Sequence, residues 1–385
     1  MKINRNNPKH WLLLIGFGLT TMLALIFRLF VPPKQHSVIL YGHKLNGNLL
    51  ALYNESRAND CGLILEFLTM DPAYHQSLLR QGVLSISAIS FLAVWRIARV
   101  NAIVTDHGLH VMQPLLLLTN IHFFDTWHGI PFKGFDENDF RTQHRYRETW
   151  VTSPLLQKIY IERFGFKEDQ VIVTGYARTD RLLNEKQSPA VIRCQLGLPV
   201  ERKTIMFAPT WIQDDQGRNI YPFGTNERTF MTALSVFAEK YECTILLRPH
   251  LNTSFNSDIL YPHVHIRASA THPNTEEMLL ATDVLVCDWS SIAFDYLLLN
   301  RPTLFLDVPA PFKKGLTLGA EYRFSEVVTG LDNLIRALYD AVTNPDMVVE
   351  QNLTHRDKVK NDIYADRADG NAAKRCIERL LLAKV

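Results

Sequence analysis

The sequence predicts an α/β protein with two domains facing a cleft, each a parallel sheet covered by helices, behind an apolar N-terminal helix. Three observations support this. Short continuous apolar runs recur along the chain, polar or glycine-containing turns follow them, and helix-like segments separate them. Such runs are typical of strands buried on both faces of a parallel sheet, and their alternation with helices indicates this architecture. A chain of 385 residues is long enough for two such domains.

The first predicted element is the apolar stretch WLLLIGFGLTTMLALIFRLFV, residues 11–31, within an N-terminal segment 1–33. It is about long enough to cross a bilayer. A cleaved signal peptide is the main competitor, but the exit VPPKQHS offers no small-residue cleavage site. We therefore expect an uncleaved membrane anchor, with a helix lying in the membrane interface as the alternative. Basic residues lie on both sides, so the charge flanks do not set its orientation.

The N-terminal domain is predicted to span residues 34–190. Its expected helix covers residues 83–100, and a polar, proline-punctuated junction follows at residues 185–202. Its expected strands are residues 37–40, 62–65, 102–105, 121–124 and 171–174.

The C-terminal domain, residues 191–385, repeats the same rhythm. A helix is expected from Ile292 until Asn300 and Pro302 end it, and a closing helix covers residues 370–382. Its expected strands are residues 204–207, 243–247, 284–287 and 303–306.

The composition narrows the function classes. The chain is 47% hydrophobic and 21% charged, with a formal net charge of +2, which gives no support for general nucleic-acid binding. Five scattered cysteines without a CxxC pair indicate thiols in a reducing compartment, and neither a disulfide framework nor a zinc site. Asp214 and Asp215 lack an evident third ligand, so we expect no metal.

Polar side chains with useful chemistry follow the apolar runs. Because ligands bind beyond the carboxyl ends of parallel strands, we expect these side chains to converge on the cleft. Each has a plainer explanation by itself, such as a helix cap, a surface ion pair or a structural histidine. Their repeated placement favours a site. They are His128, Arg178, Thr210, Arg248, His250, Ser290, Ser291 and Asp295.

These residue types suit transfer from a nucleotide donor. Arginine and helix N-termini bind diphosphate oxygens, and a neutral histidine can take the proton of an attacking hydroxyl. The residues alone leave open phosphoryl-type transfer and glycosyl transfer.

Five motifs in order resemble those of the CDP-glycerol glycerophosphotransferases, the family of teichoic-acid primases and polymerases, with relatives in capsule synthesis. The resemblance runs from about Asp125 to DGNAAKR (369–375). The motifs are WHGIPFK (127–133), GYARTDRLL (175–183), FAPTW (207–211), LRPH (247–250) and DWSSIAFDYLLLNRP (288–302).

The resemblance implies a GT-B fold, a CDP-polyol donor such as CDP-glycerol, no metal or further cofactor, and a lipid-linked or polymeric acceptor at a membrane. The catalytic domains then face the cytoplasm, where CDP-linked donors are made. It makes His128 the candidate base and His250 its rival, which we assign to the diphosphate. It implies a donor site around Gly129, Ile130, Pro131, Phe132, Arg178, Pro209, Thr210, Arg248, Pro249, Ser290, Ser291 and Asp295.

The chain departs from the family pattern at two places. Lys313 and Lys314 stand where acids are usual, and Asp288-Trp289 replaces a common Asp-Tyr pair. The polyol is therefore open between glycerol, ribitol and another. Two other functions stay open: a GT-B glycosyltransferase that uses a nucleotide sugar, and a membrane-anchored protein that binds nucleotide without catalysis.

Overall fold

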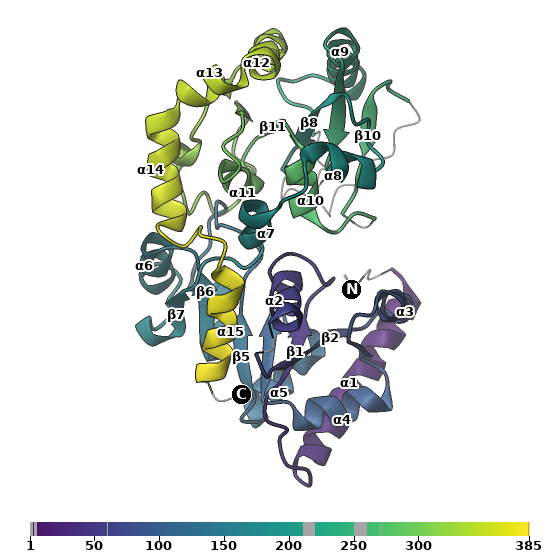
Figure 1. Cartoon of the computed structure of the whole chain (residues 1–385). Helices are drawn as coiled ribbons and strands as arrows, with labels where there is room; N and C mark the ends of the chain where they lie inside the picture. Colours follow the sequence, from purple (N-terminus) through teal and green to yellow (C-terminus); the bar gives the residue numbers. More distant parts are fainter. Residues whose placement is uncertain are drawn as a thin grey trace. The chain divides into compact units, whose positions relative to one another are not determined.

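The structure is a computed structural model that describes residues 3, 6–59, 61–210, 220–249, 260–269, 271–383 and 385 (Figure 1). Contacts group them into two compact units. Unit 1 comprises Met1–His128, Asp136–Asp180 and Asp366–Val385, and unit 2 comprises Gly129–Phe135 and Arg181–Ala365.

The described part of unit 1 holds a seven-stranded parallel sheet of order β3-β2-β1-β4-β5-β6-β7. Its strands are β1 Ser37–Tyr41, β2 Ile64–Thr69, β3 Ser85–Ser87, β4 Ala102–Thr105, β5 His122–Asp125, β6 Glu148–Val151 and β7 Val171–Val173. Its α-helices are α1 Pro8–Arg28, α2 Gly47–Ala58, α3 Pro72–Arg80, α4 Phe91–Arg99, α5 Gln113–Leu118, α6 Pro154–Glu162 and α15 Ala372–Leu382. Short 3-10 turns are η1 His110–Met112, η2 Glu137–Phe140, η3 Gln143–Arg145 and η4 Glu168–Gln170.

Unit 2 is built on a second parallel sheet, six-stranded in its described residues, of order β10-β9-β8-β11-β12-β13. Its strands are β8 Lys203–Ala208, β9 Cys243–Leu247, β10 Val264–Ile266, β11 Val284–Cys287, β12 Thr303–Leu306 and β13 Val327–Val328. Its helices are α8 Pro189–Gln195, α9 Glu227–Lys240, α10 Thr275–Ala281, α11 Ile292–Leu297, α12 Leu331–Thr343, α13 Pro345–Glu350, α14 Leu353–Tyr364 and the 3-10 turn η5 Ala320–Tyr322. Helix α7, Thr179–Asn184, begins in unit 1 and ends in unit 2.

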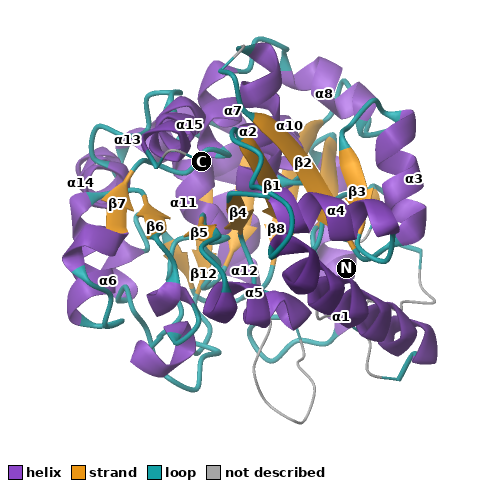
Figure 2. Ribbon diagram, turned by 90° about the horizontal axis from the view of Figure 1, so that it is seen from below, coloured by secondary structure: helices purple, strands orange, loops and turns teal. Residues whose placement is uncertain are grey.

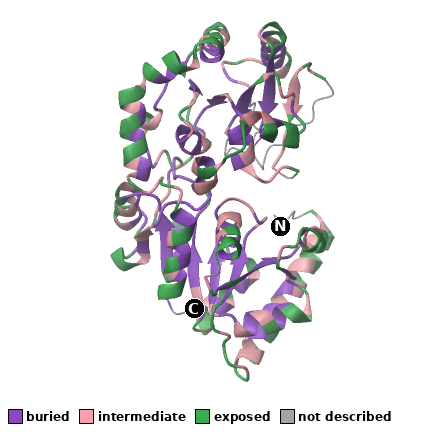
Figure 3. Cartoon of the chain, viewed as in Figure 1, coloured by how far each residue is buried: buried purple, intermediate pink, exposed green. Residues whose placement is uncertain are grey.

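The predicted α/β class with two parallel sheets is confirmed. Both sheets are mostly buried beneath partly exposed helices (Figure 3). Four strands, β4, β9, β11 and β12, have the predicted bounds.

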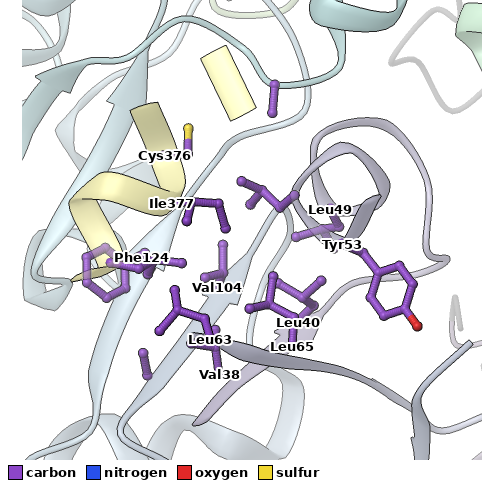
Figure 4. Close-up of a cluster of buried hydrophobic side chains, with 14 of the residues drawn as sticks. Val38, Leu40, Leu49, Tyr53, Leu63, Leu65, Val104, Phe124, Cys376 and Ile377 are labelled. Carbon is purple, nitrogen blue, oxygen red and sulfur yellow. The ribbon is translucent and has the colours of Figure 1, made fainter. Parts of the chain in front are cut away.

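The C-terminal residues return to unit 1, although the sequence placed them in a domain 191–385. Figure 4 shows Cys376 and Ile377 of α15 beside apolar side chains of the first sheet. At the start of α15, the Asp180 carboxylate accepts hydrogen bonds from the Ala372 and Ala373 amides. An amphipathic closing helix needs an apolar surface, and the unit 1 sheet supplies it.

The prediction of a helix over residues 83–100 is wrong for the first half of this range. Residues 85–87 pair with β2 as strand β3, and the Ser90 side chain then accepts a hydrogen bond from the Ala93 amide at the start of α4. Pairing at the sheet edge outweighs local helix propensity here.

Helix α1 is, among the described residues, the one helix long and apolar enough to cross a membrane. It lies against α4, η1 and α5 within unit 1 (Figure 2).

Candidate active site

In unit 1, three adjacent strands end beside one another and each is followed by a histidine. Strand β4 leads into Asp106 and His107, strand β5 into His128, and strand β1 into His43. The register aligns the last residues of all three strands. Because parallel strands share a carboxyl edge, these imidazoles meet although their positions in the sequence are far apart.

The imidazoles form a cluster in which one pair is stacked. The ring centroids of His107 and His128 lie 4.7 Å apart with planes inclined by 11°, and those of His43 and His107 lie 4.4 Å apart. His110 joins at the edge, 5.9 Å from His43, and its Nδ1 lies 2.7 Å from the Tyr41 hydroxyl.

The Asp106–His107 turn orients His128. Nδ1 of His128 lies 3.2 Å from the backbone oxygen of Asp106. A carbonyl oxygen only accepts, so this bond requires the proton on Nδ1 and leaves Nε2 with a lone pair. The side chain of Asp106 holds His107 in turn, with 2.7 Å between Oδ1 and Nδ1.

The carboxylates and histidines shift one another's pKa. Burial lowers the pKa of His107, but the charge and hydrogen bond of Asp106 outweigh it and raise that pKa overall. Burial raises the pKa of Asp125 to about 7. Desolvation by the neighbouring groups, and then a charge on His107, lower the pKa of His128, which keeps its imidazole neutral near pH 7. Because residue 128 still has solvent-exposed surface, water reduces the size of this shift.

A strained backbone presents His128. Trp127 has φ 46°, a left-handed conformation that a bulky residue rarely adopts. Its backbone oxygen and that of Thr126 both accept from the Asn48 side-chain amide, at 2.9 and 3.0 Å. The Asn48 amide oxygen accepts from the Arg178 amide at 3.0 Å. The turn before His128 and the predicted site residue Arg178 are thereby fixed to one another.

In unit 2, Asp288 ties the end of β11 to the end of β8. Its carboxylate accepts from the Thr210 amide at 2.9 Å, from the Thr210 hydroxyl, and from the Trp289 amide at 2.6 Å. Thr210 and the serine corner are thus brought together, with Pro209 buried beside them. In the sequence analysis Asp288 lies within the last motif, 288–302, but has no assigned role in the site.

The two serines stand at the start of α11. Ser291 occupies the N-cap position, but its side chain makes no capping hydrogen bond, so the plain capping explanation does not hold for it. Ser290 and Ser291 are both half-buried. Helix α11 has only six residues, so the hydroxyls matter more here than the helix dipole does.

The segment Gly129–Phe135 belongs to unit 2 and packs beside the serines. A side chain added at Gly129 would place its Cβ 2.9 Å from Ser291 Oγ, so a larger residue there would force the Ser291 hydroxyl to move. Phe132 contacts Trp289 and Phe294, with ring centroids 5.5 and 5.2 Å away. Ile130, Pro131 and Phe132 are buried, and of these Phe132 packs directly against the residue that precedes the serines.

Two residues that are predicted to contact the donor have side chains that are hydrogen-bonded to other groups of the protein. The guanidinium of Arg248 donates to the backbone oxygens of Arg267 and His272, at 3.0 and 2.7 Å, and to the Thr275 hydroxyl. The carboxylate of Asp295 accepts from the Tyr364 hydroxyl at 3.1 Å. Their roles toward a donor stay predictions. Pro249 is buried, and His250, Asp214 and Asp215 lie outside the described residues.

Arg323 is a candidate that the sequence analysis missed. Its guanidinium carbon lies 4.2 Å from the centre of the Trp289 ring, next to the serines. Its Nε and Nη1 are buried and have no hydrogen-bond partner among the described residues. No motif flagged it, because Arg323 lies outside the five motifs that carry the resemblance. Within the described ranges, no group of three His, Cys, Asp or Glu could hold a metal ion.

The comparisons with known proteins agree with the resemblance of the motifs. The model of a family described as CDP-glycerol:poly(glycerophosphate) glycerophosphotransferase matches residues 22–382. The teichoic acid poly(ribitol-phosphate) polymerase of Bacillus spizizenii is 26% identical over 302 residues, 73% of this chain and 46% of that protein. The teichoic acid poly(glycerol phosphate) polymerase of Staphylococcus epidermidis is 31% identical over 211 residues, 48% of this chain and 28% of that protein. The chain spans about half the length of the first two curated relatives that it matches.

Solved structures show the fold. The wall teichoic acid polymerase TagF superposes with a TM-score of 0.75 at 19% identity, covering 97% of this chain and 94% of that one. A histidine-to-asparagine variant of TagF, soaked with CDPG, gives a TM-score of 0.73 at 18% identity, covering 95% and 93%. The fold of this chain is therefore GT-B-like.

Proposed function

The chain belongs to the CDP-glycerol:poly(glycerophosphate) glycerophosphotransferase family, and on this basis we propose that it transfers a polyol phosphate from a CDP-activated donor to a hydroxyl of a growing cell-wall polymer. The observation that carries the reaction type is the family match over residues 22–382. Relatives named for glycerol phosphate and for ribitol phosphate both match, so the donor class is CDP-polyol, with CDP-glycerol first. The acceptor is a lipid-linked or polymeric polyol phosphate.

In this reaction the acceptor oxygen attacks the β-phosphorus of the donor, which carries the polyol. A new P–O bond forms, the bond to the bridging oxygen breaks, and CMP leaves with that oxygen. His128 takes the acceptor proton at Nε2. The support for this role is its Nδ1 contact with the Asp106 carbonyl, which leaves Nε2 as an acceptor.

Unit 2 binds the donor. The hydroxyls of Ser290 and Ser291 and the guanidinium of Arg323 suit diphosphate oxygens, and the Asp288 carboxylate holds Thr210 and the serine corner in place. We assign His250 to the diphosphate as well. No metal and no further cofactor take part in this proposal.

The protein works at a membrane, with its catalytic units on the cytoplasmic side. Two observations support this: α1 is strongly apolar, and all five cysteines are free thiols. The cytoplasmic side follows from the expected supply of CDP-linked donors there.

The nucleotide product tests the proposed function. Purified chain is incubated with CDP-glycerol and a glycerol-phosphate-primed acceptor, and nucleotides are separated by ion-exchange chromatography. CMP release that requires acceptor, with glycerol phosphate appearing in the polymer, is the expected result. Attack at carbon would release a nucleoside diphosphate instead, and nucleotide binding without any release would place the chain among non-catalytic proteins.

A further inference from the structure

Asn48 is a buried polar side chain near the start of α2, outside all five motifs. It is 2% exposed, and Leu49 and Leu52 on the same helix are fully buried in the apolar core of unit 1. Asparagine is mostly exposed in proteins, and it favours a helix less than leucine does. A polar amide that is buried at such a position needs hydrogen bonds to offset the cost of its burial.

Asn48 makes hydrogen bonds with both ends of its amide. Its Nδ2 donates to the backbone oxygens of Thr126 and Trp127, at 3.0 and 2.9 Å. Its Oδ1 accepts from the backbone amide of Arg178 at 3.0 Å. Because carbonyl oxygens only accept and a backbone N–H only donates, the nitrogen must face the first turn and the oxygen the second. An ionised aspartate supplies the acceptor without the donors, and leucine supplies neither.

The turn that accepts the two N–H groups contains a strained residue. The φ of Trp127 is 46°, a conformation that persists only where the surroundings hold it. Its amide donates to Asp125 Oδ1 at 3.2 Å, and its ring centroid lies 5.1 Å from that of Phe140. Asn48 holds its carbonyl oxygen. Since the peptide bond is planar, the position of that oxygen also sets the direction in which the chain enters His128.

The position of His128 tolerates little movement. Its Nδ1 lies 3.2 Å from the backbone oxygen of Asp106, at the long end of the range of about 2.7–3.2 Å for such bonds. A small shift of the turn would break this bond and allow the proton to move to Nε2. The imidazole would then lose the lone pair that a base needs at Nε2. The contact of Asn48 with the turn therefore bears on the tautomer of His128.

The same asparagine fixes the turn that contains Arg178. That turn follows β7, whereas the turn of His128 follows β5, and β6 lies between these two strands. The Arg178 side chain is buried, and its guanidinium carbon lies 4.9 Å from the centre of the Tyr176 ring. One side chain of α2 thus connects two turns that are not neighbours in the sheet.

We propose that Asn48 is a positioning residue for catalysis: its N–H groups hold the turn that presents His128, and its amide oxygen fixes the Arg178 turn to the same point. The consequence for turnover rests on the proposed function, in which His128 is the base. The effect on the His128 imidazole does not depend on that function.

Asn48→Asp tests the proposal, because aspartate keeps the shape and the acceptor but, when ionised, has no N–H to donate. Turnover at saturating CDP-glycerol and acceptor should fall by roughly 10–100-fold, since a misplacement of about 1 Å costs up to about 100-fold. The dissociation constant of CDP-glycerol, measured by calorimetry, should stay within about threefold of that of the parent. Asn48→Leu removes all three hydrogen bonds, so it should lose at least as much turnover whatever the protonation state of the aspartate.

Two controls separate position from chemistry and from stability. Asn333 on α12 also donates from its amide to a backbone oxygen, that of Thr329, so Asn333→Asp makes the same change away from the turns and should turn over like the parent. Leu52→Ala removes a fully buried side chain one turn after Asn48. It should lower the melting temperature, yet turn over within about twofold of the parent per folded molecule below that temperature. An equal loss of turnover in Leu52→Ala and Asn48→Asp would make Asn48 structural and overturn the proposal.

The tautomer of His128 gives a readout that needs no turnover. In the full chain labelled with ¹⁵N-histidine, the signals of His128 are assigned by their loss in His128→Gln. Near neutral pH the parent should carry the proton on Nδ1, and Asn48→Asp should show a mixture of tautomers or a changed Nδ1 signal. Identical His128 signals in Asn48→Asp and the parent would overturn the proposal. If the signals change but the parent releases no CMP, the positioning role stands and the proposed function fails.

Discussion

The two units place their candidate site residues in different chemical settings. In unit 1, imidazoles and carboxylates meet at the ends of β1, β4 and β5, and Asp125 has its pKa raised to about 7. In unit 2, hydroxyls and backbone amides collect after β8 and β11, and three donors occupy the Asp288 carboxylate. The guanidinium groups of Arg248 and Arg323 follow β9 and β12. Imidazoles and carboxylates are groups that can exchange protons, whereas hydroxyls, amides and guanidinium groups suit a phosphate and keep their own protons. Both units are parallel sheets covered by helices. Under the proposed function, unit 1 transfers the proton and unit 2 binds the donor.

The largest effect should come from unit 1. His128→Ala removes the proposed base, so turnover at saturating donor and acceptor should fall by roughly 10²–10⁴. His265→Ala is the control, because that histidine lies on the edge strand β10 of unit 2. Steady-state CMP release measures both. If His128→Ala turned over normally, His128 would not be the base, and the proposed role of the histidine cluster in proton transfer would be wrong.

The next effect belongs to unit 2. Ser290→Ala combined with Ser291→Ala removes two hydroxyl hydrogen bonds to a charged diphosphate, at about 1.5–3 kcal/mol each. The affinity for CDP-glycerol should therefore fall by about a hundredfold or more, as measured by calorimetry. Ser188→Ala is a matched control, since Ser188 also sits at a helix N-cap of unit 2 without a side-chain capping bond. Equal donor affinity in the double variant and the parent would make the serines structural.

A smaller effect tests the electrostatics of unit 1. The ordinary pKa of an aspartate is 3.8, and burial raises that of Asp125 to about 7 in the folded protein. Between these values the folded chain holds a proton that the unfolded chain has lost, so this group's contribution to stability is lost as the pH rises. As the pH rises between these values, the free energy of unfolding of the parent should therefore fall more steeply than that of Asp125→Asn. The two slopes should differ by up to roughly 1.4 kcal/mol per pH unit. Urea denaturation at several pH values between 4 and 7 measures the difference, and parallel curves would mean that Asp125 is ionised in the folded state.

The sequence predicts the central strands best, because continuous apolar runs bounded by polar turns have few alternatives. It does not predict β6, in which Glu148 is buried, because the reason lies far along the chain. The Glu148 carboxylate is paired with Arg379 of α15, 2.5 Å from its Nη2. The packing of α15 on unit 1 cannot be predicted for the same reason. An amphipathic pattern predicts that one face of a helix is buried, but it does not indicate which sheet buries it.

For the site, the motifs locate His128 and the serine corner but not their neighbours. His43 and His107 are single histidines in loops, and only the parallel register of β1, β4 and β5 brings them to His128. Arg323 contacts the ring of Trp289, and this contact cannot be predicted because the two residues are far apart in the sequence. Arg248 is predicted to contact the donor; its guanidinium is also hydrogen-bonded to a neighbouring loop, which no motif indicates, and its role toward a donor stays a prediction.

The most direct test of this division of labour is the dissociation constant of CDP-glycerol for His128→Ala, measured by calorimetry beside its turnover. If unit 1 handles the proton and unit 2 holds the donor, the variant should bind CDP-glycerol within about threefold of the parent while its turnover falls by the roughly 10²–10⁴ expected for a lost base. Donor affinity that falls as far as turnover does would contradict the account, because His128 would then be a donor-binding group.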